Sequence, residues 1–398
     1  MYARTLLHKS LGKRCHDIHA TRLDTCWLTV QSLIEGAQAT VTSVGRGMSG
    51  NAYDKHKIKR VDRLLSNSFL HQELPVIYSA LTGKLLKNMA EPIILIDWSP
   101  LCADQGWQLL RAAIPVGGRS LTLYEEVHPR KKLGNRKTQH EFLNELATLV
   151  PPCCKPVVVA DSGFKTPFYS YVEKKLGWHW IGRIRSRDFI AFNDDPTQWF
   201  GAKGLYNQAT TQAKDLGQID WVRSNPLPSR LILIRQPKKR RQDLTYTGTQ
   251  RQSKRSHSHA SREREPWLLV CSLSLKDRAA KKLTGIYRRR MQIEEGFRDC
   301  KAVRYGLGMS QRSRMNAKRR AVLCLLASLA QFVLWCVGTA GQNTEYARRL
   351  RVNSSSKRPA YSSIFMGRLL AAQKHFRLPD KELLSVLDRI QFNPEAVS

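Results

Sequence analysis

The chain has 398 residues, too many for one average compact domain, and its 42% hydrophobic residues suffice for a sizeable buried core. Its charge is unusual, because 66 Lys and Arg residues against 32 Asp and Glu residues leave a formal net charge of +34. Such an excess favours DNA or RNA as a partner over an anionic membrane surface, since basic side chains release counterions from a phosphate backbone.

The cysteine pattern excludes two classes of protein. The nine cysteines are scattered and form no CxxC motif. An odd number without paired spacing fits neither a disulfide-stapled secreted domain nor a zinc-ligand set. The first residues also lack the apolar stretch of a secretory signal. We therefore expect a reduced, cytoplasmic protein.

The first 85 residues are predicted to form a helical, DNA-binding domain. Ile58, Val61 and Leu65 follow the period of a helix, and a short helix and a Gly/Asn turn precede them, as in a helix-turn-helix unit. The other faces of the same helix carry the candidate DNA-contacting cations Lys55, Lys57, Lys59, Arg60 and Arg63. The alternative is a solvated basic face on an ordinary helical bundle.

Short apolar runs that alternate with helical patterns begin near residue 90. In chain order we expect a strand at EPIILIDWS, a hairpin that turns at Gly117 and Gly118, a helix at HEFLNELATLV, a strand at PVVVADSGF, a helix at FYSYVEKKLG and a strand at WHWIGRIR. This order predicts an α/β domain with a mixed sheet covered by helices.

Residues from about 187 to 265 interrupt this domain. They contain one clear strand, at 229–236, and then a polar tract at 237–262 with eight Lys or Arg residues and a single acid, Asp243. We interpret the tract as a flexible basic loop, which either contacts DNA or is simply solvated. A strand at EPWLLVCSL, a helix from about residue 276 and a helical tail beyond residue 345 complete the chain.

Residues 321–341 form an uncharged apolar run of 21 residues that follows three basic side chains. Length and flanking charge fit a transmembrane helix. However, the run is unique in the chain and contains Ser328, Gln331 and Thr339. Because a helix that is apolar all round also occurs at the centre of a large soluble protein, we expect a buried core helix.

One helical pattern gathers chemically useful side chains. The segment TGIYRRRMQIEEGFRDCKAV contains Tyr287, Arg290, Glu294 and Lys301, at offsets of 0, 3, 7 and 14 residues from Tyr287. On a continuous helix these four residues lie within an arc of about 60°. Glu295 would point about 100° away. The pattern therefore selects Glu294 as the candidate functional acid.

Two aspartates follow apolar strands: Asp97 after IILI and Asp161 after VVVA. Taken alone, each is more typical of a turn or a helix cap. Strand ends, however, hold side chains rigidly where α/β sheets collect their active sites. Together with Glu294, two such carboxylates suit a pair of Mg²⁺ ions, for which Mn²⁺ can substitute.

These motifs resemble the DDE transposases of bacterial insertion sequences, in the insertion sequence four family. Four positions match the Y-x2-R-x3-E-x6-K signature of that family: Tyr287, Arg290, Glu294 and Lys301. ILIDWS and VVVADSGFKTP are similar to its two aspartate motifs, although Ser162 stands where we expect Ala in close relatives. The resemblance covers essentially the whole chain.

The resemblance implies three regions. Residues 1–85 would be the helical DNA-binding domain, 86–345 an RNase H-like catalytic domain, and 346–398 a helical C-terminal region. A mainly β insertion would occupy about 187–265. Asp97, Asp161 and Glu294 would be the catalytic, metal-binding triad.

The resemblance also implies cut-and-paste chemistry on double-stranded DNA, namely end nicking, hairpin formation, hairpin opening and strand transfer. Tyr287, Arg290 and Lys301 would hold phosphates, and Trp267 would stack on a flipped base. A homodimer would join the terminal inverted repeats of its own element to target DNA in a bacterial, nucleoid-associated complex without a membrane. Three alternatives remain: an inactive DNA-binding relative, a nuclease or resolvase without strand transfer, and a basic membrane protein.

Overall fold

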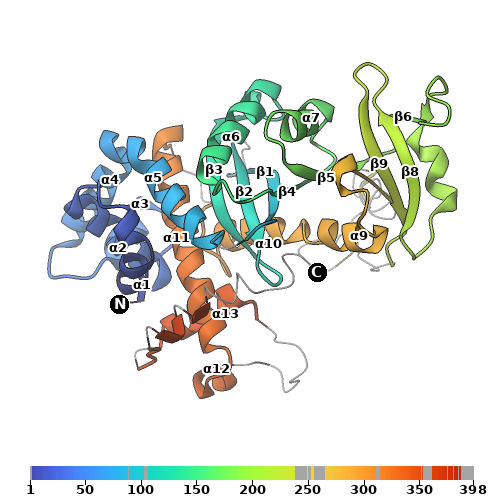
Figure 1. Ribbon diagram of the computed structural model, residues 1–398. Coiled ribbons are helices and arrows are strands. Elements are labelled where there is room, and N and C mark those ends of the chain that lie inside the picture. Colours follow the sequence, from blue (N-terminus) through green and yellow to red (C-terminus); the bar gives the residue numbers. More distant parts are fainter. Residues whose placement is uncertain are drawn as a thin grey trace. The chain divides into compact units, whose positions relative to one another are not determined.

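The computed structural model divides the chain into two compact units, Met1–Pro156 with Arg289–Ser398, and Val157–Arg288 (Figure 1). It describes residues 2–87, 89–102, 106–237, 249, 252–254, 265–310, 314–350, 352, 361–373, 375–379, 381–383 and 385–386. The basic tract predicted at 237–262 lies almost entirely outside the described residues. The three domain boundaries expected from the sequence stay a prediction.

Helices make up the N-terminal part of the first unit, as expected. They are α1 (Tyr2–Leu11), α2 (Ala20–Ile34), α3 (Val41–Gly47), α4 (Asp54–Ser66) and α5 (Ser68–Leu85). The caps explain two of the starts, because Thr40 and Asn67 accept hydrogen bonds from backbone N–H groups in the first turns of α3 and α5. Val61 and Leu65 of α4 are buried, which leaves its basic face outward.

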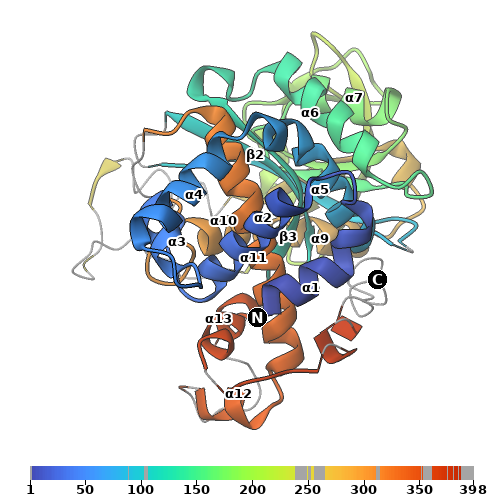
Figure 2. The same cartoon turned by 90° about the vertical axis from the view of Figure 1, so that its left-hand side faces the viewer.

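The long apolar helix α11 (Ala317–Gly341) belongs to the core of the first unit. By length and composition alone it could cross a membrane, but 94% of its most apolar window is buried inside the protein. It contacts α2, α4, α5, α13 and β3 (Figure 2). Its polar residues are satisfied internally, since Ser328 donates to Glu125 and Gln331 donates to the Gly296 carbonyl. The expected core helix is confirmed.

Three antiparallel strands form the sheet of the first unit, in the order β3-β2-β1. Their bounds are β1 (Ile93–Pro100), β2 (Trp107–Pro115) and β3 (Ser120–Pro129). The predicted hairpin is confirmed: Gly117 and Gly118 have φ of 69° and 87°, the left-handed conformation that a two-residue turn requires. Helix α6 (Arg136–Leu149) follows where the sequence predicts it.

The structure corrects the place of Asp97. It lies within β1 and not at its end, because the ladder with β2 continues through Trp98, Ser99 and Pro100. Asp97 is paired directly with Arg111 of β2. Directly opposed residues of an antiparallel pair point to the same face of a sheet.

The second unit has a mixed sheet in the order β4-β5-β10-β9-β8-β6-β7, with β4 parallel to β5 and the other pairs antiparallel. Its strands are β4 (Val157–Ala160), β5 (His179–Ile184), β6 (Phe189–Phe192), β7 (Phe200–Gly201), β8 (Lys214–Trp221), β9 (Leu227–Ile234) and β10 (Trp267–Cys271). Helix α7 (Thr166–Lys174) connects β4 to β5. The described part of the inserted segment is therefore mainly β, and it holds more strands than the one that its sequence reveals.

The helix predicted to carry Tyr287 to Lys301 is two helices, so the single-helix prediction is wrong. They are α9 (Ala280–Arg288) and α10 (Met291–Lys301), and the chain turns between them at Arg289 and Arg290. Tyr287 belongs to the second unit, whereas Arg290, Glu294 and Lys301 belong to the first.

The remaining helices complete the described chain. The helical tail is confirmed in its described part by α12 (Glu345–Leu350) and α13 (Ser363–Ala371). Short 3-10 helices are Gly12–Arg14, Arg130–Lys132, Ala202–Gln208 and Leu273–Leu275. The order β1-β2-β3-α6-β4-α7-β5 is the predicted α/β order, that of an RNase H-like core with helical N- and C-terminal regions.

Candidate active site

The Arg290 guanidinium joins two acids that are far apart in the sequence. Its Nη2 lies 2.6 Å from Glu294 Oε1, and its Nη1 lies 3.4 Å from Asp97 Oδ2. Arg290 and Asp97 are 13% and 14% exposed, whereas Glu294 is 43% exposed. Asp97 Oδ1 also accepts a hydrogen bond from the Trp98 backbone N–H. The first unit thus brings two of the three predicted carboxylates to one guanidinium.

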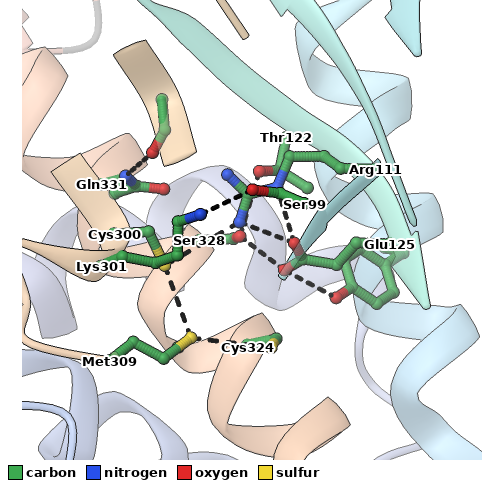
Figure 3. A network of polar contacts seen from close by, with 12 residues as sticks. Ser99, Arg111, Thr122, Glu125, Cys300, Lys301, Met309, Cys324, Ser328 and Gln331 are labelled. Atoms are coloured by element: carbon green, nitrogen blue, oxygen red, sulfur yellow. Dashed lines mark hydrogen bonds and ion pairs between the residues drawn. The ribbon is translucent and has the colours of Figure 1, made fainter. Parts of the chain in front are cut away.

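Lys301, at the other end of α10, reaches the same strand. Its Nζ donates to Ser99 Oγ at 2.6 Å (Figure 3) and, outside the view, to the Pro100 carbonyl at 3.1 Å. Since alternate residues of a strand share a face, Ser99 lies on the same face as Asp97. Burial lowers the pKa of Lys301 below its ordinary value. Helix α10 therefore contacts one face of β1 with a cation at each of its ends.

A buried ion pair lies on that face of the sheet. Arg111 Nη2 is 2.7 Å from Glu125 Oε2, and both side chains are 1% exposed. Ser328 of α11 donates to Glu125 at 2.7 Å (Figure 3). The Arg111 guanidinium lies 4.9 Å from the centre of the Phe297 ring of α10. Burial lowers the pKa of Arg111, but Glu125 outweighs burial and the net pKa is raised. The pair thus ties β2 and β3 to both α10 and α11.

Asp161 stands in the second unit, directly after β4, as predicted. Its Oδ1 accepts a hydrogen bond from the Gly163 backbone N–H at 2.7 Å. Ser162, the residue that departs from the family pattern, accepts a hydrogen bond from Arg185 Nε at 2.8 Å. The local geometry therefore gives the serine a partner of its own.

Trp267 and Tyr287 contact one another in the second unit, with ring centres 5.2 Å apart and edge to face. Arg183 of β5 lies 5.8 Å from the Trp267 ring centre. The Nε and Nη2 atoms of Arg183 are buried, and neither makes a hydrogen bond among the described residues. Burial lowers the pKa of Arg183. Sequence reasoning missed this residue, although an arginine inside the apolar strand WHWIGRIR was a signal for it.

The predicted basic face of α4 borders a hollow of about 940 Å³. Four of its five candidate cations line this hollow and are exposed: Lys55, Lys59, Arg60 and Arg63. Lys57 is half-buried and lies outside the lining. His19 and Arg22, at the start of α2, also line the hollow, and Arg22 is paired with Glu73 of α5. The hollow is therefore rich in positive charge.

The two acids that contact Arg290 are suitable ligands for a divalent cation. Asp97 and Glu294 converge on a positive group, and carboxylate oxygens are the ligands that Mg²⁺ prefers. Within the described ranges, no three His, Cys, Asp or Glu side chains are grouped closely enough to hold a metal by themselves. In the first unit the cation between the carboxylates is the Arg290 guanidinium.

An α/β fold that presents carboxylates from a strand and a helix beside fixed cations is the arrangement of a phosphoryl-transfer enzyme. The family model described as "Transposase DDE domain" matches residues 89–330. The chain belongs to this family and is therefore an enzyme that catalyses DNA transposition, cleaving DNA and transferring its strands. Transposases of this family use divalent metal ions.

Two further comparisons add little. The curated proteins gave no match. Among solved structures, the cryo-EM structure of a piggyBac transposase synaptic complex with hairpin DNA is similar at 11% identity and a TM-score of 0.42. The similarity covers 93% of this chain and 75% of that chain. At this level it carries no argument about the activity of this chain.

Proposed function

We propose that the protein is the cut-and-paste transposase of a bacterial insertion sequence of the insertion sequence four family. The transposase of the insertion sequences that flank the tetracycline-resistance transposon is the relative that its motifs most resemble. One observation carries the proposal: within a member of the DDE family, Arg290 joins Asp97 of β1 to Glu294 of α10 across 197 residues of sequence.

The proposed catalytic residues are Asp97, Asp161 and Glu294. The contacts of Asp97 and Glu294 with the same Arg290 guanidinium support the catalytic roles proposed for these two acids. Asp161 rests on its motif and on its position directly after β4. These carboxylates would hold two Mg²⁺ ions, or Mn²⁺ in their place, which activate the attacking oxygen and stabilise the leaving one.

Arg290 and Lys301 would hold phosphates of the cleaved strand. Arg290 is planar and can share its N–H groups between a carboxylate and a phosphate. Lys301 keeps its amine fixed by Ser99 Oγ and the Pro100 carbonyl, so little entropy is lost when it contacts a phosphate. Tyr287, which is 3% exposed, would contribute mainly by supporting Trp267.

Trp267 would stack on a base that is flipped out when the DNA end forms a hairpin. Stacking on an aromatic face is worth about 1–3 kcal/mol per base, comparable with the cost of unstacking it. The Arg183 guanidinium, 5.8 Å from the ring centre, supports this role because its positive charge would attract a phosphate next to the stacked base.

The hollow beside α4 would hold double-stranded DNA of the terminal inverted repeats, and the protein would join these ends to target DNA. Its four exposed cations complement a phosphate backbone. A homodimer would pair two element ends in the synaptic complex. Such a complex would work in the bacterial cytoplasm at the nucleoid, without a membrane.

The test is a reaction of purified protein with a supercoiled plasmid that carries two element ends, in the presence of Mg²⁺. We expect the flanking DNA as a blunt fragment, and element ends that run as covalently closed hairpins on a denaturing gel before they open. Nicked plasmid without hairpins or joined products would instead indicate a nuclease.

A further inference from the structure

The turn between β2 and β3, residues 116–119, and Ser120 at the start of β3 contact one face of α10 (Figure 1). The Gln292 side-chain carbonyl accepts hydrogen bonds from two backbone N–H groups of the turn, those of Val116 and Gly118, both at 3.1 Å. One amide oxygen is therefore held twice. A side chain in the first turn of α10 thus fixes the helix to the hairpin.

Arg119 of the same turn adds charged contacts further along the helix. Its Nε is 2.7 Å from Asp299 Oδ2, and its Nη1 is 3.7 Å from Glu295 Oε2. Both Arg119 Nε and Asp299 Oδ2 are buried, and their geometry is that of an ion pair without an aligned hydrogen bond. Ser120 lies so near Gly296 that a Cβ on that glycine would collide with Ser120 Oγ.

The contacted positions of α10 form one stripe: Gln292, Glu295, Gly296 and Asp299. Their spacing of 0, 3, 4 and 7 is that of neighbours on a single helix face. At about 100° per residue, Arg290, Glu294 and Lys301 lie about 160–200° from Gln292. The turn therefore holds the face opposite to the one that meets Asp97 and Ser99.

We propose that the β2–β3 turn sets the rotation of α10 about its axis, and that Gln292 and Arg119 are positioning residues for Glu294. Helix α10 is only 11 residues long and is not continuous with α9, so its first turn needs an anchor of its own. A rotation of the helix would move Glu294 away from Asp97. The inference rests on the proposed catalytic role of Glu294.

Matched substitutions at Gln292 test this role. Gln292→Met keeps the length of the side chain but removes the acceptor, whereas Gln292→Glu keeps an acceptor oxygen for both N–H groups. Arg298→Met is the control on the same helix, because the Arg298 side chain is 68% exposed and its ion pair within the described residues is with Glu295.

The first readout is the single-turnover rate of end cleavage at saturating DNA. We expect Gln292→Met to lower this rate by about 10- to 100-fold, since small misplacements of a reacting group are costly. The dissociation constant of Gln292→Met for end DNA should change less than about twofold, because the contact between Gln292 and the β2–β3 turn lies outside the basic hollow beside α4. Gln292→Glu and Arg298→Met should stay within about threefold of wild type.

Two readouts do not depend on activity. Amide hydrogen exchange of residues 293–297 should be faster in Gln292→Met than in wild type and restored in Gln292→Glu. The affinity for Mn²⁺, measured by electron paramagnetic resonance, should likewise be lower in Gln292→Met than in wild type and be restored in Gln292→Glu. If the wild type failed to cleave, the proposed function would fail, and the positioning role would be judged on exchange and Mn²⁺ binding. Equal exchange and equal Mn²⁺ affinity in all variants would overturn it.

Discussion

Arg290 Nη2 lies 2.6 Å from Glu294 Oε1, one helical turn further along the chain. The same guanidinium reaches Asp97, so a single cation screens the repulsion between two acids. A divalent ion bound by both carboxylates would take over this screening and free Arg290 for a phosphate. On this account Arg290 would have two roles, to screen the carboxylates before a metal ion binds and to contact a phosphate afterwards.

We predict that Arg290→Met lowers the cleavage rate at saturating DNA by about 100-fold. Arg290→Lys should recover only part of it, because an ammonium cannot contact two acids in one plane as a guanidinium does. The rates of the two variants, measured beside Arg298→Met as the control, check this. A lysine variant as active as wild type would show that the charge alone matters.

Removal of one partner of the buried pair Arg111 and Glu125 should strongly destabilise the first unit. Arg111→Met leaves the Glu125 carboxylate buried without its counter-charge, and we expect a loss of about 3–5 kcal/mol in the free energy of unfolding. The double variant Arg111→Met/Glu125→Gln should recover more than half of that loss, since Ser328 and Tyr78 can still bond the amide. Urea unfolding measures the free energy of unfolding of both variants. Equal losses in the single and the double variant would show that the buried, unpaired charge of Glu125 is not the cause.

Asp299 should make stability depend on pH. Burial raises the pKa of Asp299 from 3.8 to about 6, although Arg119 opposes the rise. A carboxyl whose folded pKa is raised contributes stability below its unfolded pKa and loses it as the pH rises through its folded pKa. From this group alone, the protein should be more stable at pH 5 than at pH 8 by on the order of 1 kcal/mol.

Asp299→Asn isolates that contribution, because other groups titrate alike in both proteins. We expect the difference in unfolding free energy between pH 5 and pH 8 to shift by the stated amount between wild type and variant. Denaturant titrations at the two pH values measure it. An identical pH dependence in the two proteins would mean that Asp299 has an ordinary pKa.

Sequence patterns predict the fold well where one local signal decides. The Gly117–Gly118 turn, the apolar strands before Asp161 and the core helix α11 are examples, since left-handed glycines, buried strands and an uncharged run each have few alternatives. Strand β8 was missed because half of its residues are exposed and only two are buried, so it lacks the alternation by which half-buried strands are found.

The site was only partly visible in the sequence. Helical periodicity favoured Glu294, and Glu295 indeed faces Arg119 and Arg298. Periodicity could not reveal the break at Arg289 and Arg290, because both residues are good helix formers. Nor could it reveal that Arg290 bridges two carboxylates, which depends on long-range packing of α10 against β1.

The hollow beside α4 should govern the salt dependence of DNA binding. Replacing Lys55, Lys59 and Arg63 by alanine removes three phosphate contacts, so the slope of log K against log salt should fall by about 2.7. Alanine at the three exposed cations near α6 is the matched control: Lys131, Arg136 and Lys137. Fluorescence anisotropy with duplex DNA at several salt concentrations gives both slopes. Equal slopes for the two triple variants would remove α4 from the DNA interface.

The most direct test of the catalytic account compares wild type, Asp97→Asn and Glu294→Gln on the same end DNA with Mg²⁺. Both substitutions keep the size of the side chain and one acceptor oxygen, but they replace the second oxygen by an NH2 donor and remove the carboxylate charge. The account predicts that all three proteins bind the end DNA with affinities within about threefold, and that only wild type cleaves it, over a background of less than about 1%. Cleavage by either variant at a rate near that of wild type would contradict it.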